Sequence, residues 1–437
     1  MSTSRPVEAT LDFATRQLHA ARPRDEVRSR TTPIYLSAGF PFDDFDQAAE
    51  HFGTGEGFSY TRVANPTTAS AERLIAGLEG GAEAVLVGSG QAAIAIALLG
   101  LVDAGGHIVA GASLYEGTRG LLGDNLVRLG ITTDFVADAN DAVAWEALIR
   151  PETRALVVES IPNPRNDLVD IALVADVAHA HGIPLVVDNT LATPYLLRPL
   201  EHGADIVVHS TSKFLAGHGS VLGGVIVDDG RFDALRSGAL FPHLTAPDRL
   251  GGPSWWDRFG GRARIAYLRE NVAVRFGPTL SPLNAFLLAQ GVETLSLRVE
   301  RQSANALGVA EWLAAQPEVA SVDYSGLPGN AAHALAERYL PRGQGSVFAF
   351  TLHGGREAAR RFVNALELFT PMTHLGDVRS LILHPRSTSH TLRTPEELAA
   401  AGISEGTLRV SIGIEHLPDL LRDLERGIAA AREAAAA

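Results

Sequence analysis

Lys213 has the clearest capacity for covalent chemistry in this sequence, because it closely follows an apolar segment, 206–208, that is typical of a buried strand. Burial disfavours the charged ammonium, and a neutral amine is a nucleophile towards carbonyl carbon. The hydroxyls of Ser210, Thr211 and Ser212 lie just before the lysine and could hold a phosphate. An aldehyde that carries a phosphate and binds a lysine as a Schiff base is pyridoxal 5′-phosphate, PLP. A lysine in isolation could equally be a solvated loop residue, so this interpretation depends on its surroundings.

Asp188 ends the preceding apolar segment, in HGIPLVVDNT. Residues 183–187 are rich in β-branched side chains, which favours a buried parallel strand. In open α/β sheets, ligands bind outside the carboxyl ends of the strands. A carboxylate there can pair with the protonated nitrogen of a pyridine ring, although Asp188 could also stabilise a turn. Since the next strand leads to Lys213, we expect the two side chains to face one crevice.

The segment VLVGSGQAAIAIALL predicts a strand over 85–87, a turn over 88–90 and a helix from Gln91 onward. Helix N-termini bind phosphate through free N–H groups and the helix dipole, so Gly90 and Gln91 are candidate phosphate ligands. The same letters spell G-x-G-x-x-A, the fingerprint of dinucleotide-binding folds. That fold needs an acidic residue at the end of the next strand, and the next strand, HIVAGAS, ends without one. A single phosphate is therefore favoured over NAD.

These candidate residues need a sheet that brings strand ends together. From about residue 61 to 262, the apolar segments AVLV, HIVA, RALVVES, PLVVD, DIVVHS and GGVIVD alternate with helical stretches, which predicts an α/β fold with a mostly parallel sheet. At 437 residues the chain exceeds what one hydrophobic core usually supports. We expect an N-terminal arm over 1–60 that contacts a neighbouring subunit, a large cofactor-binding domain over 61–262, and a smaller α+β domain over 263–437.

Composition narrows the function classes. The net charge of −13, from 37 basic and 50 acidic residues, argues against nucleic-acid binding. The sequence has no cysteine, so disulfides and a thiolate nucleophile are excluded. The histidines lack zinc-type spacing, and no metal is expected. No apolar run approaches a membrane span, and the N-terminus lacks a hydrophobic signal core, so we expect a cytoplasmic enzyme.

Eight motifs, in order, make the chain similar to a known family: YTRVANPT, GSGQAA, LYEGT, ESIPNP, PLVVDNTLATPYL, ADIVVHSTSKFLAGHG, SPLNAFLLAQGVETLSLR and LRVSIGIEH. From about Thr15 to Leu424 the chain resembles the PLP-dependent enzymes of cysteine and methionine metabolism, and among them it is most similar to the O-acetylhomoserine sulfhydrylases. The resemblance implies the type I fold of PLP-dependent transferases, which is aspartate aminotransferase-like. It also implies a homo-oligomer, expected to be a tetramer built as a dimer of dimers.

The resemblance implies a role for each matching residue. Lys213 carries the cofactor and acts as general base, Asp188 pairs with the pyridine nitrogen, and Tyr115 stacks on the ring. The other implied assignments are Gly90, Gln91, Ser210 and Ser212 for the phosphate, Tyr60 and Arg62 for the phosphate of a neighbouring subunit's cofactor, Asn163 beside the phenolic oxygen and the substrate, and Arg409 and Ser380 for the substrate carboxylate. A guanidinium suits carboxylate binding because it can donate two parallel hydrogen bonds.

The implied reaction is a γ-substitution on an O-acylated homoserine, with O-acetyl-L-homoserine as the expected substrate and sulfide or a thiol as nucleophile. The product would be homocysteine or a thioether amino acid. One alternative is cystathionine γ-synthase or γ-lyase activity on the same scaffold, which differs in its products. A second alternative is a nucleotide-binding or regulatory protein without PLP, which would lack a visible absorbance band.

Three residues depart from the pattern expected of the sulfhydrylases. His374 stands where an asparagine is expected, Glu116 replaces a glycine, and Arg386 adds a guanidinium beside the carboxylate-binding region. We hypothesise that Arg386 binds a second acidic group on the nucleophile or the acyl group. The alternative is that Arg386 points to solvent or pairs with a nearby carboxylate, since exposed ion pairs are common.

Overall fold

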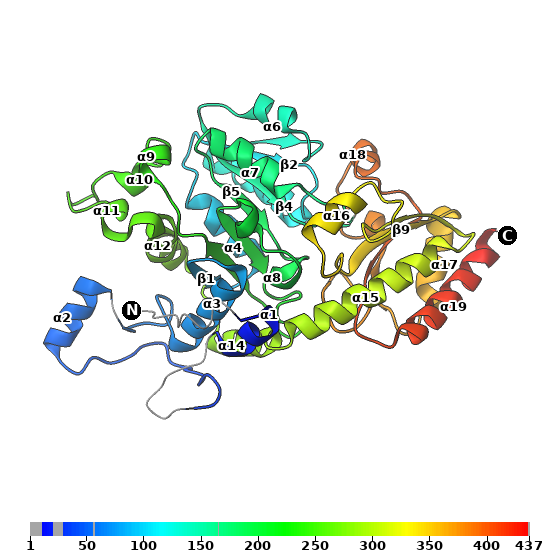
Figure 1. The fold of residues 1–437 in the computed structure, drawn as a ribbon, viewed down its shortest axis with the longest axis horizontal. Helices are drawn as coiled ribbons and strands as arrows, with labels where there is room; N and C mark the ends of the chain where they lie inside the picture. Colours follow the sequence, from blue (N-terminus) through cyan, green and yellow to red (C-terminus); the bar gives the residue numbers. More distant parts are fainter. Residues whose placement is uncertain (1–10, 21–28, 56, 165, 436–437) are drawn as a thin grey trace.

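A seven-stranded sheet forms the larger of two bodies in the computed structural model, which describes residues 11–20, 29–55, 57–164 and 166–435 (Figure 1). The strand order is β1-β7-β6-β5-β4-β2-β3, and every neighbouring pair is parallel except those that include β7. All the apolar segments expected to be strands form strands of this sheet. The strands are β1 (Glu83–Val87), β2 (His107–Gly111), β3 (Thr132–Val136), β4 (Thr153–Glu159), β5 (Leu185–Asp188), β6 (Ile206–Ser210) and β7 (Gly224–Asp228).

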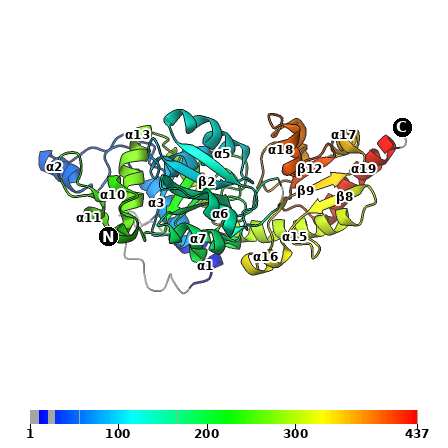
Figure 2. The same cartoon turned by 90° about the horizontal axis from the view of Figure 1, so that it is seen from above.

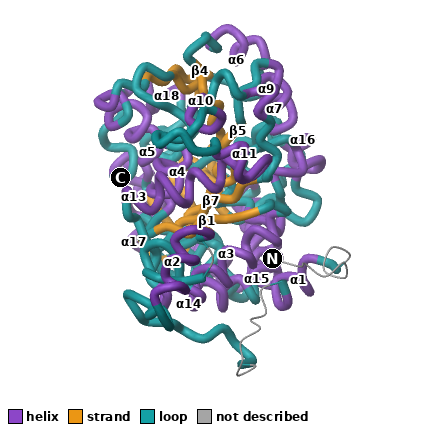
Figure 3. Tube along the Cα trace, turned by 90° about the vertical axis from the view of Figure 1, so that its left-hand side faces the viewer, coloured by secondary structure: helices purple, strands orange, loops and turns teal. Residues whose placement is uncertain are grey.

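Helices cover both faces of this sheet, so its central strands are apolar on both sides (Figure 3). Val187 packs on the face covered by α3, α7 and α14, whereas its neighbour Val186 packs on the face covered by α4 and α12. The helices of this body are α3 (Pro66–Glu79), α4 (Gly90–Leu99), α5 (Glu116–Gly120), α6 (Ala142–Leu148), α7 (Ile171–Ala180), α8 (Thr193–Leu196), α9 (Ala234–Ser237), α10 (Pro242–Thr245), α11 (Trp255–Phe259), α12 (Ala263–Tyr267), α13 (Val274–Phe276) and α14 (Pro282–Val292).

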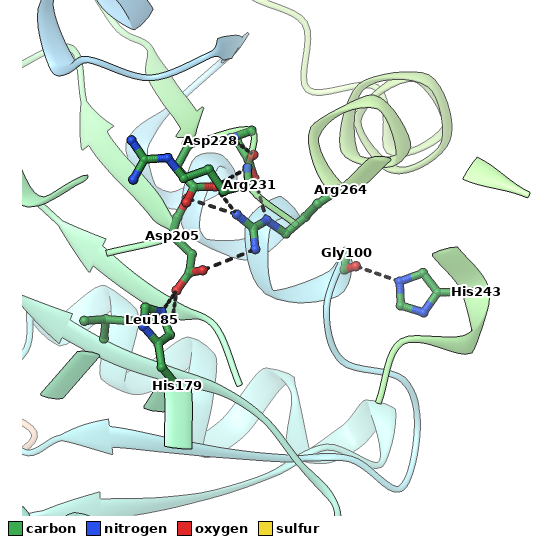
Figure 4. Close-up of polar contacts among 10 residues, drawn as sticks. Gly100, His179, Leu185, Asp205, Asp228, Arg231, His243 and Arg264 are labelled. Atoms are coloured by element: carbon green, nitrogen blue, oxygen red, sulfur yellow. Dashed lines mark hydrogen bonds and ion pairs between the residues drawn. The ribbon is translucent and has the colours of Figure 1, made fainter. Parts of the chain in front are cut away.

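Arg264 on α12 binds carboxylates at one end of β6 and β7, the end opposite to the one that Lys213 follows (Figure 4). Its guanidinium Nε donates to Asp228 at 2.5 Å and an Nη donates to Asp229 at 2.8 Å, while Asp205 lies 3.6 Å away and also binds His179 at 2.9 Å. A buried cation needs such a set of carboxylates to offset its lost hydration. The network therefore explains why charged residues stand at this end of the strands, which carries no candidate catalytic residue.

A second, five-stranded sheet forms the smaller body, with strand order β10-β11-β12-β9-β8. The long helix α15 joins the two bodies: Leu295 and Val299 pack in the core of the first, and Val309 and Leu313 pack beneath the second (Figure 2). The elements here are α15 (Leu295–Ala314), β8 (Val319–Asp323), α16 (His333–Tyr339), β9 (Val347–Leu352), α17 (Gly355–Ala365), β10 (Thr370–Pro371), β11 (Leu381–Leu383), α18 (Pro395–Ala400), β12 (Thr407–Ser411) and α19 (Leu417–Ala435).

The packing bears on the expected domain boundary at 262/263. Helices α12 and α14 follow that boundary, yet Ile265 and Leu288 pack against the first sheet. The chain enters the second core only within α15, so a boundary inside that helix agrees better with the packing. The division of the chain into domains stays a proposal.

The N-terminal segment leads away from the first body. After α1 (Phe13–His19), residues 31–44 are mostly without regular structure and lead to α2 (Phe45–Thr54), which has no buried residue and projects from the molecule in Figure 1. The first ten residues of the expected arm, and 21–28, lie outside the described residues. Within the described part of the chain, every helix is too short or too polar to cross a bilayer.

Candidate active site

Lys213 lies in the turn that follows β6, and the residue is half-buried. The backbone N–H of Lys213 donates to the carbonyl of Ser210 at 3.2 Å. The Nζ atom of Lys213 lies 3.1 Å from Nδ1 of His374. Burial, helped by the nearby charge of Arg409, lowers the pKa of Lys213 to about 8. Lys213 is also the only lysine among the 437 residues, because the other 36 basic residues are arginines. The chain therefore has one ε-amine, and its surroundings favour the nucleophilic form.

Asp188 ends β5, beside β6, as expected. Its carboxylate oxygen Oδ1 accepts hydrogen bonds from the N–H and the hydroxyl of Thr190, at 2.9 and 2.5 Å. The same hydroxyl accepts from the backbone N–H of Ser210 at 2.9 Å, so Thr190 ties the ends of the two strands together. Because both hydrogen bonds from Thr190 end on Oδ1 of Asp188, Oδ2 can accept a hydrogen bond from a ligand. Burial raises the pKa of Asp188.

Glu159 is a site residue that the sequence interpretation missed. It ends β4 and lies in register with Asp188 on the neighbouring strand, and it is buried. Its Oε1 accepts the backbone N–H of Tyr115 at 2.6 Å. Burial and the charge of Asp188 raise the pKa of Glu159 well above its usual range. The signal was present in the motif ESIPNP, since an acidic residue there ends an apolar strand just as Asp188 does.

The residues expected to hold a phosphate meet in one corner. Helix α4 begins at Gly90, where Ser89 caps it by accepting the N–H of Ala92 at 3.1 Å. A Cβ atom on Gly90 would lie 2.6 Å from the Cβ of Ser210, so only glycine allows the helix to approach β6 this closely. The hydroxyls of Ser210 and Ser212 lie 2.8 Å apart beside it. A helix N-terminus next to two hydroxyls is suited to a phosphate dianion.

Arg409 on β12 brings a buried guanidinium to the site from the second sheet. Only 4% of the residue is exposed, and burial lowers its pKa to about 10. One Nη donates to the carbonyls of Thr373 and His374 at 3.2 and 3.1 Å, and the other contacts Oδ1 of Asn163 at 3.4 Å. Its Nε is buried and has no partner in the part of the chain that the structure describes. This N–H is available to a substrate carboxylate.

Tyr115 precedes α5 with 53% of the residue exposed, so its ring is free to cover a ligand. Gly117 lies beneath it, because a Cβ there would come within 2.5 Å of the ring. The Gln91 side chain reaches the same turn, donating to the carbonyl of Gly117 at 2.8 Å. The structure thus connects the helix of the phosphate corner to the turn that carries the aromatic ring.

Comparison with known proteins identifies the family to which this chain belongs. Residues 14–429 match the profile described as Cys/Met metabolism PLP-dependent enzyme. The chain belongs to this family. It is 42% identical to an O-acetyl-L-homoserine sulfhydrylase of Corynebacterium glutamicum, over 96% of this chain and 97% of that one. It is also 42% identical to a homocysteine synthase of Schizosaccharomyces pombe, over 97% and 99% of the two chains.

A solved structure confirms the fold class. The crystal structure of a putative O-acetylhomoserine (thiol)-lyase from Campylobacter jejuni superposes with a TM-score of 0.90 at 36% identity, over 96% of this chain and all of that one. That protein carries a pyridoxyl-lysine phosphate. The present chain is therefore a PLP-dependent enzyme of the Cys/Met metabolism family with the type I fold. Its residues fit the cofactor: one lysine amine, a half-buried carboxyl whose Oδ2 is left by Thr190 to a ligand, and a helix start that lies close to the hydroxyls of Ser210 and Ser212 because residue 90 is glycine.

Ser380, expected to bind the substrate carboxylate, has other partners in this structure. Ser380 is fully buried, its hydroxyl donates to Glu415 at 2.9 Å, and it accepts the N–H of Gly413 at 2.9 Å. The backbone N–H of Ser380 also donates to Glu415, at 2.6 Å. These bonds use the donors of Ser380 inside the smaller body, so it has none left for a substrate carboxylate. His374, in the preceding loop, contacts Lys213 and Arg409 instead.

The structure also corrects the hypothesis for Arg386. Its Nε lies 2.8 Å from Oε1 of Glu405, which makes an ion pair at the rim of the smaller body and leaves no basis for a second anion site there. Glu116 is paired too: it binds Arg393 and lies 3.4 Å from Nε2 of His390. The alternative kept open for Arg386, pairing with a nearby carboxylate, is therefore the one that the structure supports.

Tyr60 and Arg62 do not join the cluster around Lys213 of their own chain. Arg62 donates to the carbonyl of Val274 at 2.7 Å, and its guanidinium lies over the ring of Tyr60, 5.6 Å from the centroid. Tyr60 is 48% exposed. Their predicted contact with the cofactor of a neighbouring subunit stays a prediction.

Proposed function

We propose that this enzyme exchanges the acetyl ester of O-acetyl-L-homoserine for sulfide, giving L-homocysteine and acetate. The observation that carries the proposal is the single lysine amine, with a pKa of about 8, which follows the strand next to the one that Asp188 ends and lies near the charge of the buried Arg409 guanidinium. That arrangement suits a small amino acid bound by its carboxylate while its α-carbon is deprotonated. The names of the relatives supply the substrate.

Each residue has a defined task in this reaction. PLP, when bound, supplies an electron sink at the α-carbon. Lys213 removes the proton from the α-carbon and returns it at the end of the reaction. It also removes a proton from the β-carbon and later returns it. Arg409 holds the α-carboxylate, Asp188 keeps the ring nitrogen protonated, and Tyr115 covers the ring. The bond between the γ-carbon and the ester oxygen breaks with loss of acetate, the bond from the γ-carbon to sulfur forms, and the protons taken from carbon are given back.

A product assay tests the proposal directly. Purified enzyme with PLP is supplied with O-acetyl-L-homoserine and sulfide, and homocysteine and acetate are measured in equal amounts. O-succinylhomoserine replaces the substrate in a parallel arm, and cysteine replaces sulfide in another. Cystathionine formed faster than homocysteine would indicate a γ-synthase, and an α-keto acid with ammonia in the absence of any thiol would indicate a γ-lyase. Either result would overturn the proposed function.

We also propose that the active unit is an oligomer, a tetramer by resemblance, in which the N-terminal segment crosses to a neighbour. The support lies in exposed apolar side chains on that segment, with Phe45 at 85% and Phe52 at 78% exposure on α2. Apolar side chains gathered on a projecting helix are typical of a surface that a partner covers. A cytoplasmic location likewise stays a prediction.

A further inference from the structure

Among the residues that the structure describes, His374 has the one side chain in hydrogen-bond contact with the ε-amine of Lys213. It lies in the loop between β10 and β11, and its Nδ1 atom is 3.1 Å from Nζ. Its backbone carbonyl accepts the guanidinium of Arg409 at 3.1 Å. One residue thus touches both the proposed general base and the proposed carboxylate ligand, and none of the tasks assigned above uses its imidazole.

The contact defines the state of the imidazole. Near pH 7, below the pKa of about 8, Lys213 is mostly an ammonium, which can only donate, so Nδ1 accepts and the ring proton is on Nε2. The charged groups that face His374 are Lys213, Arg409 and Arg379, which oppose a second proton, and Asp377, which favours it. Burial is the larger effect, and together they lower the pKa of His374 to about 4. The ring is therefore neutral near pH 7 and remains an acceptor.

We infer that His374 is a positioning residue for Lys213, an inference that rests on the proposed function: its Nδ1 accepts one N–H of the lysine and turns the lone pair of the neutral amine away from the imidazole, towards the substrate. A free lysine amine rotates about its Cε–Nζ bond and offers its lone pair in several directions. Donation of one hydrogen to a fixed acceptor removes that freedom, which is worth most when the same amine must serve two neighbouring carbons.

The same bond stabilises the ammonium. An acceptor 3.1 Å from Nζ favours the charged form of Lys213, so it opposes the burial that lowers the pKa of that amine. If Nδ1 of His374 is removed and no water takes its place, the pKa of Lys213 should fall further. Nε2 of His374 is buried and has no partner in the described residues, so the N–H it carries points away from Lys213 and does not compete with this role.

The experiment compares two substitutions of the full-length protein. His374→Leu keeps the bulk of the side chain and removes the acceptor, whereas His374→Asn keeps an acceptor oxygen near the place of Nδ1. His416→Leu, an exposed histidine before α19, is the matched control. Because Lys213 is the only lysine, trace acetylation of the cofactor-free protein at a series of pH values, read by mass spectrometry of its peptide, reports the pKa of this amine alone.

His374→Leu should move the midpoint of Lys213 labelling to lower pH and reduce kcat on the order of tenfold to a hundredfold with little change in KM. His374→Asn and His416→Leu should match wild type in both measurements. An unchanged labelling midpoint in His374→Leu would overturn the inference, as would an asparagine variant as impaired as the leucine variant. The labelling involves no substrate, so a shifted midpoint in an enzyme that makes no homocysteine would refute the proposed function and leave the contact standing.

Discussion

At the scale of single residues, the site depends on the difference between a lysine, which can lose its proton, and an arginine, which keeps it. Arginine keeps its charge at any physiological pH, whereas lysine becomes neutral when burial lowers its pKa. Arg409, with a pKa of about 10, stays charged near pH 7 and can bind an anion, and Lys213, with a pKa of about 8, can act as a base. The chain uses arginine for every other long-chain basic residue, so its one lysine is the only side-chain amine available for the proposed chemistry.

This reasoning predicts the outcome of Lys213→Arg. The variant keeps a positive charge beside His374 and Arg409 but cannot form a Schiff base or accept a proton near pH 7. Turnover should fall by at least about 10²–10⁴-fold, the usual contribution of general acid–base catalysis. In wild type, labelling of the cofactor-free amine should rise as pH increases through about 8, because the ammonium is unreactive below its pKa. A labelling midpoint near 10.5 would contradict the burial argument.

At the scale of elements, the phosphate corner depends on how closely α4 approaches β6. Gly90→Ala would place a Cβ 2.6 Å from the Cβ of Ser210 and 2.8 Å from its Cα, so the helix start must move away from the strand. We expect a stability loss of about 1–3 kcal/mol from overpacking, with weaker PLP binding. Gly123→Ala, where nothing lies within 4 Å, is the control and should stay within about 0.5 kcal/mol of wild type. Urea unfolding and PLP titration measure both effects, and equal behaviour of the two variants would contradict the argument.

The elements also show why some features were predictable from the sequence and others were not. Strands such as β5 and β6 are buried on both faces, so continuous apolar runs marked them and the residues at their ends. The edge strand β3 was missed because Thr132 to Asp134 are polar and partly exposed. In the loop before β11 there is no periodicity to indicate which side chains face the site, so the contact of His374 with Lys213 could not be predicted, and Ser380 was assigned from the family resemblance alone.

At the scale of the whole molecule, the site draws on both bodies. The first sheet supplies Lys213, Asp188 and the phosphate corner, and the second sheet supplies Arg409. Several contacts cross between them, among them Arg409 to Asn163, His374 to Lys213, and the ion pair of Glu116 with Arg393. The helix α15, shared by both cores, holds the bodies in this relation. Asp188 and Lys213 follow neighbouring apolar segments, so their meeting could be expected from the sequence, whereas Arg409 is distant along the chain and its approach could be expected only from the family resemblance.

The assembly leads to the last prediction, because Tyr60 and Arg62 lie outside the cluster of their own chain. If they complete the site of a neighbour, an Arg62→Ala chain and a Lys213→Ala chain should each be impaired, and a refolded equal mixture should recover activity. If the chains pair at random, half of the dimers contain one chain of each variant, and each such hybrid has one intact site of its two. About a quarter of wild-type activity is therefore expected. A mixture of Lys213→Ala and Lys213→Arg chains is the control and should recover none. Absence of recovery in the first mixture, or full activity of a monomer in light scattering, would show that each chain completes its own site.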